Sequence, residues 1–237
     1  MATHELDSPQ HIPITENAIL RWSASKALEN IGFRDFENTA DKELLFFRIA
    51  GRLKEVERAG WKRYGIRHPE SVSDHSWRMS LLALCAKVPG VDNGRVSQMA
   101  IVHDLAEVAV GDITPHDPIK REEKARRELE TMTLFASMLS AEVGKYILDL
   151  WLEFEEKKTK ESKVANDLDK VDMVLQAVDY EETQDKTLEE FMRAVEKIVV
   201  PELRDLCYRA LARRDKVKAG EVSGSEKKRM DEYYGDT

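Results

Sequence analysis

The chain has 237 residues, of which 42% are hydrophobic and 35% charged, with only 11 Gly and 7 Pro; this composition predicts one helical domain with appendages and excludes collagen-like and low-complexity proteins. The formal net charge of -8 disfavours a protein that binds nucleic acid polymers by neutralising their phosphates. Two cysteines without a CxxC pair, no apolar run near the roughly 20 residues of a membrane span, and an acidic N-terminus predict a soluble cytoplasmic protein without a membrane partner, a nuclear location being the alternative.

Apolar residues recur at helical spacing along most of the chain, and no stretch alternates with a period of two for long enough to predict a strand. Thr15 is the expected N-cap of the first helix, and residues 61–73 are expected to form a loop. The helices are predicted over about 15–30, 39–60, 74–88, 93–110, 119–139, 140–157, 161–182, 187–198 and 201–214. We therefore expect an all-α fold: a compact multi-helix bundle over 39–212, an N-terminal extension with one helix over 1–38, and a flexible tail over 213–237.

Polar side chains interrupt the inward-facing apolar stripes of two predicted helices. In the helix over 93–110, His103 and Glu107 share the stripe at a spacing of four residues, and Asp104 adjoins them. In the helix over 74–88, His75 lies on the inward face. Because carboxylates and imidazoles are costly to bury without partners, these residues predict a polar centre between the two helices.

A divalent metal ion would partner all of these groups. Imidazole and carboxylate suit Mn, Fe, Co, Ni or Zn, and the absence of cysteine ligands argues against a closed structural zinc site. A hydrogen-bonded core histidine is the simpler explanation for His75 taken alone. It does not explain a helix that combines His103, Asp104 and Glu107 without a Lys or Arg on the same stripe.

The helix over 161–182 offers carboxylates for the same centre. Asp169 and Asp172 both lie along the edge of its apolar stripe, and their spacing does not choose between them. Asp167 and Asp169 also fit the DxDx[TV] pattern of haloacid-dehalogenase-like phosphatases, which would make Asp167 a covalent nucleophile. That pattern follows a hydrophobic parallel strand, whereas helical periodicity runs through it here, so we interpret the match as accidental.

Four segments in a fixed order carry a resemblance to a known family. They are PESVSDHS at 69–76, AIVHDLAEVAVGDITP at 100–115, PIKREEKARRE at 118–128 and DLDKVDMVLQAVDYE at 167–181. The combination resembles the HD superfamily of metal-dependent phosphohydrolases, and within it the HD domain-containing protein 2 group, which is similar to bacterial 5'-deoxynucleotidases. The resemblance covers roughly residues 40 to 200 and implies that the region over 39–212 is an HD domain.

The resemblance assigns metal ligands residue by residue. It implies that His75, His103, Asp104 and Asp169 bind the main metal ion, which selects Asp169 from the two aspartates left open above. A second metal-binding or water-activating group is implied at three further positions, Glu107, Asp112 and the backbone carbonyl of Ile113. The implied cofactor is a divalent ion, Mn, Co, Mg, Fe, Ni or Zn, with one or two per chain.

Substrate contacts are implied N-terminal to the first ligand. Arg58 and Trp61 resemble residues that contact the nucleotide, the Trp crowding the sugar so that a 2'-hydroxyl is disfavoured. A solvated arginine at a helix end is the alternative for Arg58. In the basic run after the third segment, Lys120 or Lys124 is a candidate for binding phosphate, because one of them could face the site. The family also implies a homodimer.

The implied reaction is hydrolysis of a deoxyribonucleoside 5'-monophosphate to deoxynucleoside and phosphate. A metal ion would activate the water and neutralise the phosphate dianion, with Glu107 orienting or deprotonating that water. Three other HD activities are alternatives: cyclic-nucleotide phosphodiesterase, (p)ppGpp hydrolase and deoxynucleoside triphosphate triphosphohydrolase. A non-catalytic helical scaffold stapled by the metal is an alternative of a different class.

Overall fold

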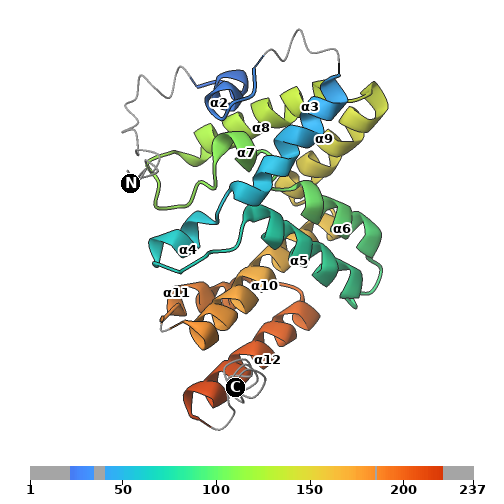
Figure 1. Cartoon of the computed structure of the whole chain (residues 1–237). Coiled ribbons are helices and arrows are strands. Elements are labelled where there is room, and N and C mark those ends of the chain that lie inside the picture. Colours follow the sequence, from blue (N-terminus) through green and yellow to red (C-terminus); the bar gives the residue numbers. More distant parts are fainter. Residues whose placement is uncertain (1–21, 35–40, 185, 221–237) are drawn as a thin grey trace, which may run out of the picture.

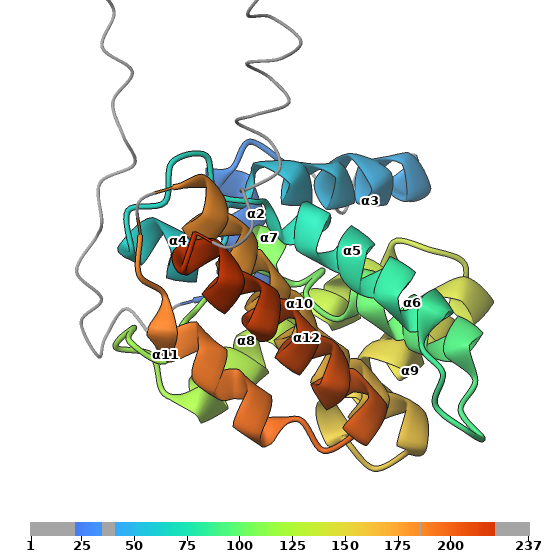
Figure 2. The same ribbon diagram turned by 90° about the horizontal axis from the view of Figure 1, so that it is seen from below.

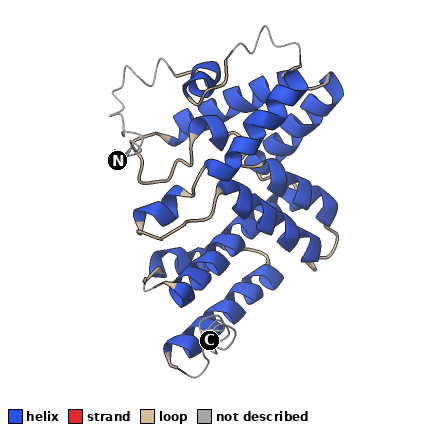
Figure 3. Ribbon diagram, in the orientation of Figure 1, coloured by secondary structure: helices blue, strands red, loops and turns tan. Residues whose placement is uncertain are grey.

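The computed structural model describes residues 22–34, 41–184 and 186–220, and in these residues every regular element is a helix (Figure 3). The helices in chain order are α2 (Ala24–Asn30), α3 (Lys42–Gly51), the 3-10 helix η1 (Arg52–Glu55), α4 (Ala59–Arg63), α5 (Val72–Cys85), α6 (Asn93–Val102), α7 (Glu107–Val110), α8 (Arg121–Ser137), α9 (Ala141–Glu156), α10 (Lys160–Thr183), α11 (Glu189–Met192), the 3-10 helix η2 (Arg193–Lys197) and α12 (Pro201–Lys218). An isolated antiparallel bridge joins Glu57 to Ser71. The predicted all-α fold is confirmed.

Helix α10 is the central element of the bundle (Figure 1). It packs against α5, α6, α9 and α12, and α12 covers its outer side when the molecule is viewed from below (Figure 2). Val164, Leu168 and Val171 on its apolar stripe are each 3% exposed or less. Because α5 and the end of α6 both meet α10, polar side chains from three helices can converge inside the bundle.

Asp167 binds the backbone of the two residues that precede α12 in the sequence. Its Oδ2 atom accepts hydrogen bonds from the backbone N–H groups of Val199 at 2.8 Å and Val200 at 2.9 Å. These groups precede Pro201, where α12 begins. Asp167 lies inside α10 rather than after a strand. The structure thus shows Asp167 bound to the backbone that leads into α12, and it does not support the role of a covalent nucleophile.

The helix expected over 39–60 ends early, which corrects that prediction. α3 stops at Gly51 and continues only as the short η1. Val56 then accepts a backbone bond from the N–H of Val72 at 2.8 Å, and the N–H of Arg58 donates to Glu70 at 3.0 Å. These long-range hydrogen bonds use backbone groups that a longer helix would need for its own hydrogen bonds, so the helix ends before them. They also fold the expected loop over 61–73 back on itself, with α4 starting inside the expected helix and ending in the loop.

The helix expected over 93–110 is broken, which is a second correction. α6 ends at Val102, and α7 starts only at Glu107. Between them the backbone bonds tighten to a three-residue spacing, from Leu105 N–H to Val102 at 3.2 Å and from Glu107 N–H to Asp104 at 3.0 Å. The tighter turn changes the direction in which the polar residues of this segment point.

The helices at the two ends of the described chain have the following extent. Ser23 caps α2, and Thr15, the expected N-cap of the first helix, lies outside the described residues. α2 packs on α7 and α8, where Glu130 accepts a bond from Ala24 N–H at 2.9 Å. At the other end, α12 continues to Lys218. No helix in the described part of the chain is both long and apolar enough to traverse a membrane.

Candidate metal centre

His75 enters the site from the first turn of α5. Ser71 caps this helix in a reciprocal arrangement, in which Ser71 Oγ accepts from the N–H of Asp74 at 3.1 Å and Asp74 accepts from the N–H of Ser71 at 2.9 Å. Such a capping box fixes the first turn. The His75 side chain, directly after it, is completely buried.

His103 and Asp104 enter from the turn at the end of α6. The His103 ring is buried beside Phe154, with 4.8 Å between the ring centroids. Its Nδ1 lies 2.8 Å from the backbone oxygen of Ala100. Because a carbonyl oxygen can only accept, Nδ1 carries the proton and Nε2 is left with its lone pair.

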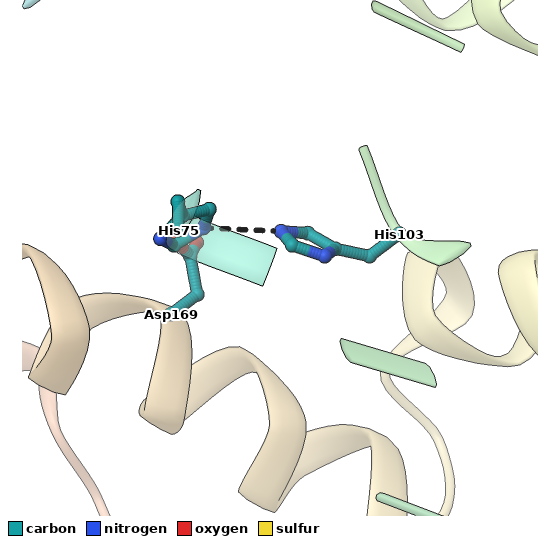
Figure 4. A group of neighbouring side chains, drawn as sticks. All are labelled: His75, His103 and Asp169. Atoms are coloured by element: carbon teal, nitrogen blue, oxygen red, sulfur yellow. Dashed lines mark hydrogen bonds and ion pairs between the residues drawn. The ribbon is translucent and has the colours of Figure 1, made fainter. Parts of the chain in front are cut away.

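Three potential ligand atoms, from His75 on α5, His103 in the turn after α6 and Asp169 on α10, lie within 4.8 Å of one another, and Asp104 lies beside the two histidines. His75 Nε2 lies 3.3 Å from His103 Nε2 and 3.3 Å from Asp169 Oδ1 (Figure 4). Asp104 Oδ2 lies 3.0 Å from His103 Nε2 and 3.8 Å from His75 Nε2. Atoms bound to one metal ion at ~2.1 Å are themselves separated by ~3 Å or slightly more. The observed separations therefore suit a shared ion.

The second nitrogen of His75 supports the same conclusion. Its Nδ1 lies 2.6 Å from Asp172 Oδ2, and a carboxylate at this distance accepts the Nδ1 proton. In the neutral form, both histidines therefore direct an Nε2 lone pair toward Asp104 and Asp169. Two lone pairs and two carboxylates facing one another attract a cation, which is a proton on His75 in the metal-free chain, and the residues fit a divalent metal ion in the same place.

The positive and negative side chains of the cluster stabilise each other's charged forms, and this shifts their pKa values. Burial and Arg58 lower the pKa of His75, but the hydrogen bonds that its ring donates to Asp169 and Asp172 outweigh them and raise the pKa to about 9. Burial raises the pKa of Asp104, yet the neighbouring His103 and Arg58 hold it far below its usual range. The pKa of Asp169 is likewise lowered against burial, chiefly by His75. Both carboxylates are therefore ionised at neutral pH.

Glu107 is a buried acid beside this cluster. Its side chain is 2% exposed, and its Oε2 atom has no hydrogen-bond partner in the described structure. Burial, followed by the charges of Asp104 and Asp112, raises its pKa well above the usual value. The charges of Arg58 and Lys124 oppose this rise, and Nζ of Lys124 lies 3.8 Å from Oε1. An unpartnered buried carboxyl with a raised pKa is typical of acid–base groups and of metal sites that carry an ion.

Arg58 reaches the cluster from the residue before α4. Its Nη1 atom lies 3.3 Å from Asp104 Oδ2, and although burial alone lowers the pKa of Arg58, the charges of Asp112 and Asp104 raise it. Asp112 also fixes the adjoining backbone, because its Oδ2 accepts from the N–H of Ala59 at 2.7 Å. The structure thus brings Arg58 to the site, and Ile113 directly follows Asp112 on the same loop.

Two predicted substrate residues lie away from the four ligand atoms. Trp61 is 2% exposed; its ring packs on Phe191 and Tyr180, with centroids 4.4 Å and 5.3 Å away, so no open face of this ring is left for a sugar. Lys120 is exposed at the N-cap of α8. The lysine brought to Glu107 is Lys124, one turn further along the helix.

Two residues behind His75 have positions that the sequence did not predict. Asp172 was expected only as an alternative ligand, whereas its carboxylate contacts the outer nitrogen of the imidazole. Arg78 was not a candidate at all, and its Nε donates to Asp172 Oδ1 at 2.5 Å. The spacing of three residues from His75 to Arg78 and from Asp169 to Asp172 was the available signal, because it places each pair on one helix face.

Comparison with known proteins gives a consistent result. The family model described as HD domain matches residues 50–207. The chain is 45% identical over 146 residues to the 5'-deoxynucleotidase HDDC2 of Dictyostelium discoideum, an alignment that covers 58% of this chain and 77% of that protein. It is 39% identical over 183 residues to the Bos taurus protein of the same name, covering 76% and 89% respectively. The solved structure of the HD domain-containing protein YGK1 matches with a TM-score of 0.61 and 25% identity, over 82% of this chain and 97% of that chain.

Proposed function

The chain belongs to the HD domain family, and on this basis we propose that it is a 5'-nucleotidase that hydrolyses deoxyribonucleoside 5'-monophosphates to a deoxynucleoside and phosphate. The relatives named above as 5'-deoxynucleotidases support the activity. The observation that carries the proposal is the meeting of the His75, His103, Asp104 and Asp169 ligand atoms beside an acid, Glu107.

We assign the binding of a divalent ion to these four residues. Glu107, Asp112 and the backbone carbonyl of Ile113 are the proposed ligands of a second ion. The ligand set suits Mn, Fe, Co, Ni or Zn. When bound, such an ion supplies positive charge to the phosphate and makes water a stronger acid.

The side chains around the proposed ligands bind the phosphate and transfer protons. Arg58 and Lys124 are the cations that face the carboxylates of the site, and in the proposal they attract the phosphate dianion and hold its oxygens. The Oε2 atom of Glu107 takes the proton of the attacking water as the new P–O bond forms. The bond from phosphorus to the 5'-oxygen then breaks, and the leaving oxygen takes up a proton.

The preference for a deoxy sugar is proposed from the relatives. Because the side chain of Trp61, a residue of α4, is buried, it acts on the sugar through the position of α4 and Arg58 rather than by direct contact. Its Nε1 donates to Glu70 at 2.9 Å, and Glu70 also accepts the backbone bond from Arg58. The proposal further includes a homodimer in the cytoplasm; sedimentation equilibrium and fluorescence localisation test these two statements.

A nucleotide panel with product identification tests the proposed function. The full chain is loaded with Mn²⁺ or Co²⁺ and incubated with deoxynucleoside and ribonucleoside monophosphates, 3',5'-cyclic nucleotides, (p)ppGpp and deoxynucleoside triphosphates. Orthophosphate from the deoxynucleoside monophosphates, followed by ³¹P NMR, is the expected product. Release of pyrophosphate or triphosphate, or turnover of cyclic nucleotides alone, would reject the proposal.

A further inference from the structure

We propose that Arg78 is a positioning residue that joins the metal centre to the segment bearing the substrate-binding arginine: it holds His75 through Asp172, and α4 with Arg58 through Glu70. Arg78 forms its ion pairs with Asp172, Glu70 and Asp179, and none of these is among the four proposed ligands. We call the link from Arg78 to His75 the metal arm and the link from Arg78 to α4 the substrate arm. The substrate arm rests on the proposed function. The metal arm rests only on the contacts that lead from Arg78 to the group of proposed metal ligands.

The first arm runs from Arg78 to His75. Nε of Arg78 donates to Asp172 Oδ1 at 2.5 Å, and Nη2 donates to the backbone oxygen of Asp172 at 3.1 Å. The other carboxylate oxygen of Asp172 accepts the Nδ1 proton of His75 at 2.6 Å. A carboxylate behind a metal-binding histidine fixes the tautomer and the ring orientation. Arg78 fixes that carboxylate in turn.

The second arm runs from Arg78 to the start of α4. Nη2 of Arg78 lies 3.8 Å from Glu70 Oε2. The other carboxylate oxygen of Glu70 accepts from Trp61 Nε1 at 2.9 Å, and its backbone oxygen accepts from the N–H of Arg58 at 3.0 Å. Glu70 therefore contacts both Arg78 and the two residues of the α4 segment that the sequence predicts to bind nucleotide.

Burial explains why an arginine is needed between the two arms. The Asp172 side chain is completely buried, as is that of His75, and Glu70 is 10% exposed, so both acids require a cation that can reach them. Arg78 is 23% exposed and serves both acids at once. Its planar fork allows these contacts at fixed angles, which the single ammonium of a lysine cannot reproduce.

Asp179 provides a matched control on the same arginine. Its carboxylate lies 3.3 Å from Nη1 of Arg78, but its side chain is 60% exposed, and it contacts neither Glu70 nor His75 in the described structure. An exposed ion pair of this kind contributes little. Removing the Asp179 charge tests whether the loss of any ion-pair partner of Arg78 weakens metal and substrate binding, or whether only the two buried partners, Asp172 and Glu70, matter.

The test measures metal affinity and catalysis separately in Arg78→Gln, Arg78→Lys, Asp172→Asn and Asp179→Asn full-length chains. Co²⁺ affinity is measured by competition with a fluorescent chelator, and KM and kcat are measured with a deoxynucleoside monophosphate. We expect Arg78→Gln and Asp172→Asn to bind Co²⁺ ~10- to 100-fold more weakly, with Arg78→Lys between them and wild type. For Arg78→Gln, but not Asp179→Asn, KM at saturating Co²⁺ should also rise.

Thermal melting followed by circular dichroism shows whether each variant is folded. If Asp172→Asn does not fold because its side chain is buried, Arg78→Gln still provides the test, since Arg78 is partly exposed. Wild-type Co²⁺ affinity in a folded Arg78→Gln chain would overturn the metal arm. An unchanged KM at saturating Co²⁺ would overturn the substrate arm. If the wild-type chain hydrolyses no nucleotide, the proposed function fails, whereas weaker Co²⁺ binding by Arg78→Gln still supports the metal arm.

Discussion

Asp172 accepts the Nδ1 proton of His75 across 2.6 Å, and this bond turns the opposite nitrogen of the ring toward the other proposed metal ligands. Asp169, one turn earlier on the same helix, lies 3.3 Å from that opposite nitrogen. One helix thus provides both the carboxylate that orients the imidazole and a carboxylate that we propose as a ligand. The two aspartates that the sequence could not distinguish have different positions and, we propose, different roles.

Asp167 and Asp169 form a matched pair for substitution, because they lie two residues apart on α10. Asp169→Asn should lose bound metal and activity while the apo chain stays folded. Asp167→Asn should keep its metal, but its free energy of unfolding should fall by about 1–3 kcal/mol, because two backbone N–H groups lose their charged partner. Metal analysis by mass spectrometry and urea unfolding check both. Metal loss in Asp167→Asn alone would contradict the assignment.

Glu107→Gln should lower kcat by about 10²- to 10⁴-fold, because the amide cannot accept the proton of the attacking water. The main ion should be retained, since its four proposed ligands remain. Glu128→Gln is the control: burial raises the pKa of Glu128 to about 7 and it also contacts Lys124, but it is not among the proposed ligands. A kcat loss in Glu128→Gln as large as that in Glu107→Gln would refute the role of Glu107.

Lys124→Met should raise KM for a deoxynucleoside monophosphate by about 10- to 100-fold, the loss expected for one charged hydrogen bond to phosphate. Lys120→Met should leave KM unchanged, because Lys120 is exposed at the start of α8. Steady-state kinetics at saturating metal distinguish the two lysines. A KM effect confined to Lys120→Met would reverse the assignment.

Metal affinity should increase with pH. Without metal, the pKa of His75 is raised to about 9, so below this pH an ion must displace a proton from the imidazole. The apparent affinity should rise by about tenfold per pH unit between pH 7 and 9 and level off above it. Calorimetry in two buffers of different ionisation enthalpy measures the proton release directly. A pH-independent affinity would show that His75 is not a ligand.

The helical class of the fold was predictable, because apolar spacing reports which helix faces are buried. The helix breaks were not, since residues 93–110 contain no proline and no glycine near the break at His103 to Ala106. There the chain leaves helical geometry where His103 and Asp104 enter the cluster. Similarly, α3 ends where backbone bonds to residues 70–72 begin, and one sequence does not reveal such distant partners.

The ligand atoms were predictable only to the level of residues. Helical spacing predicted that His75, His103 and Glu107 point inward with Asp104 adjoining them, and the resemblance selected Asp169. The partners of Asp172 and Glu107 could not be predicted, because they depend on how the helices pack against one another. Arg78 and Asp172 meet through the contact between α5 and α10, and Lys124 rather than Lys120 reaches Glu107 because of how α8 lies beside α7.

We propose that hydrolysis of deoxynucleoside monophosphates requires one ion, bound by His75, His103, Asp104 and Asp169. The most direct measurement is the phosphate release of one protein sample as purified, after chelation, and after titration with Mn²⁺ or Co²⁺, with metal content determined at each step. We predict that activity disappears on chelation and returns in proportion to bound metal in the wild type, but not in Asp169→Asn. Full activity in the metal-free chain, or restored activity in Asp169→Asn, would contradict the account.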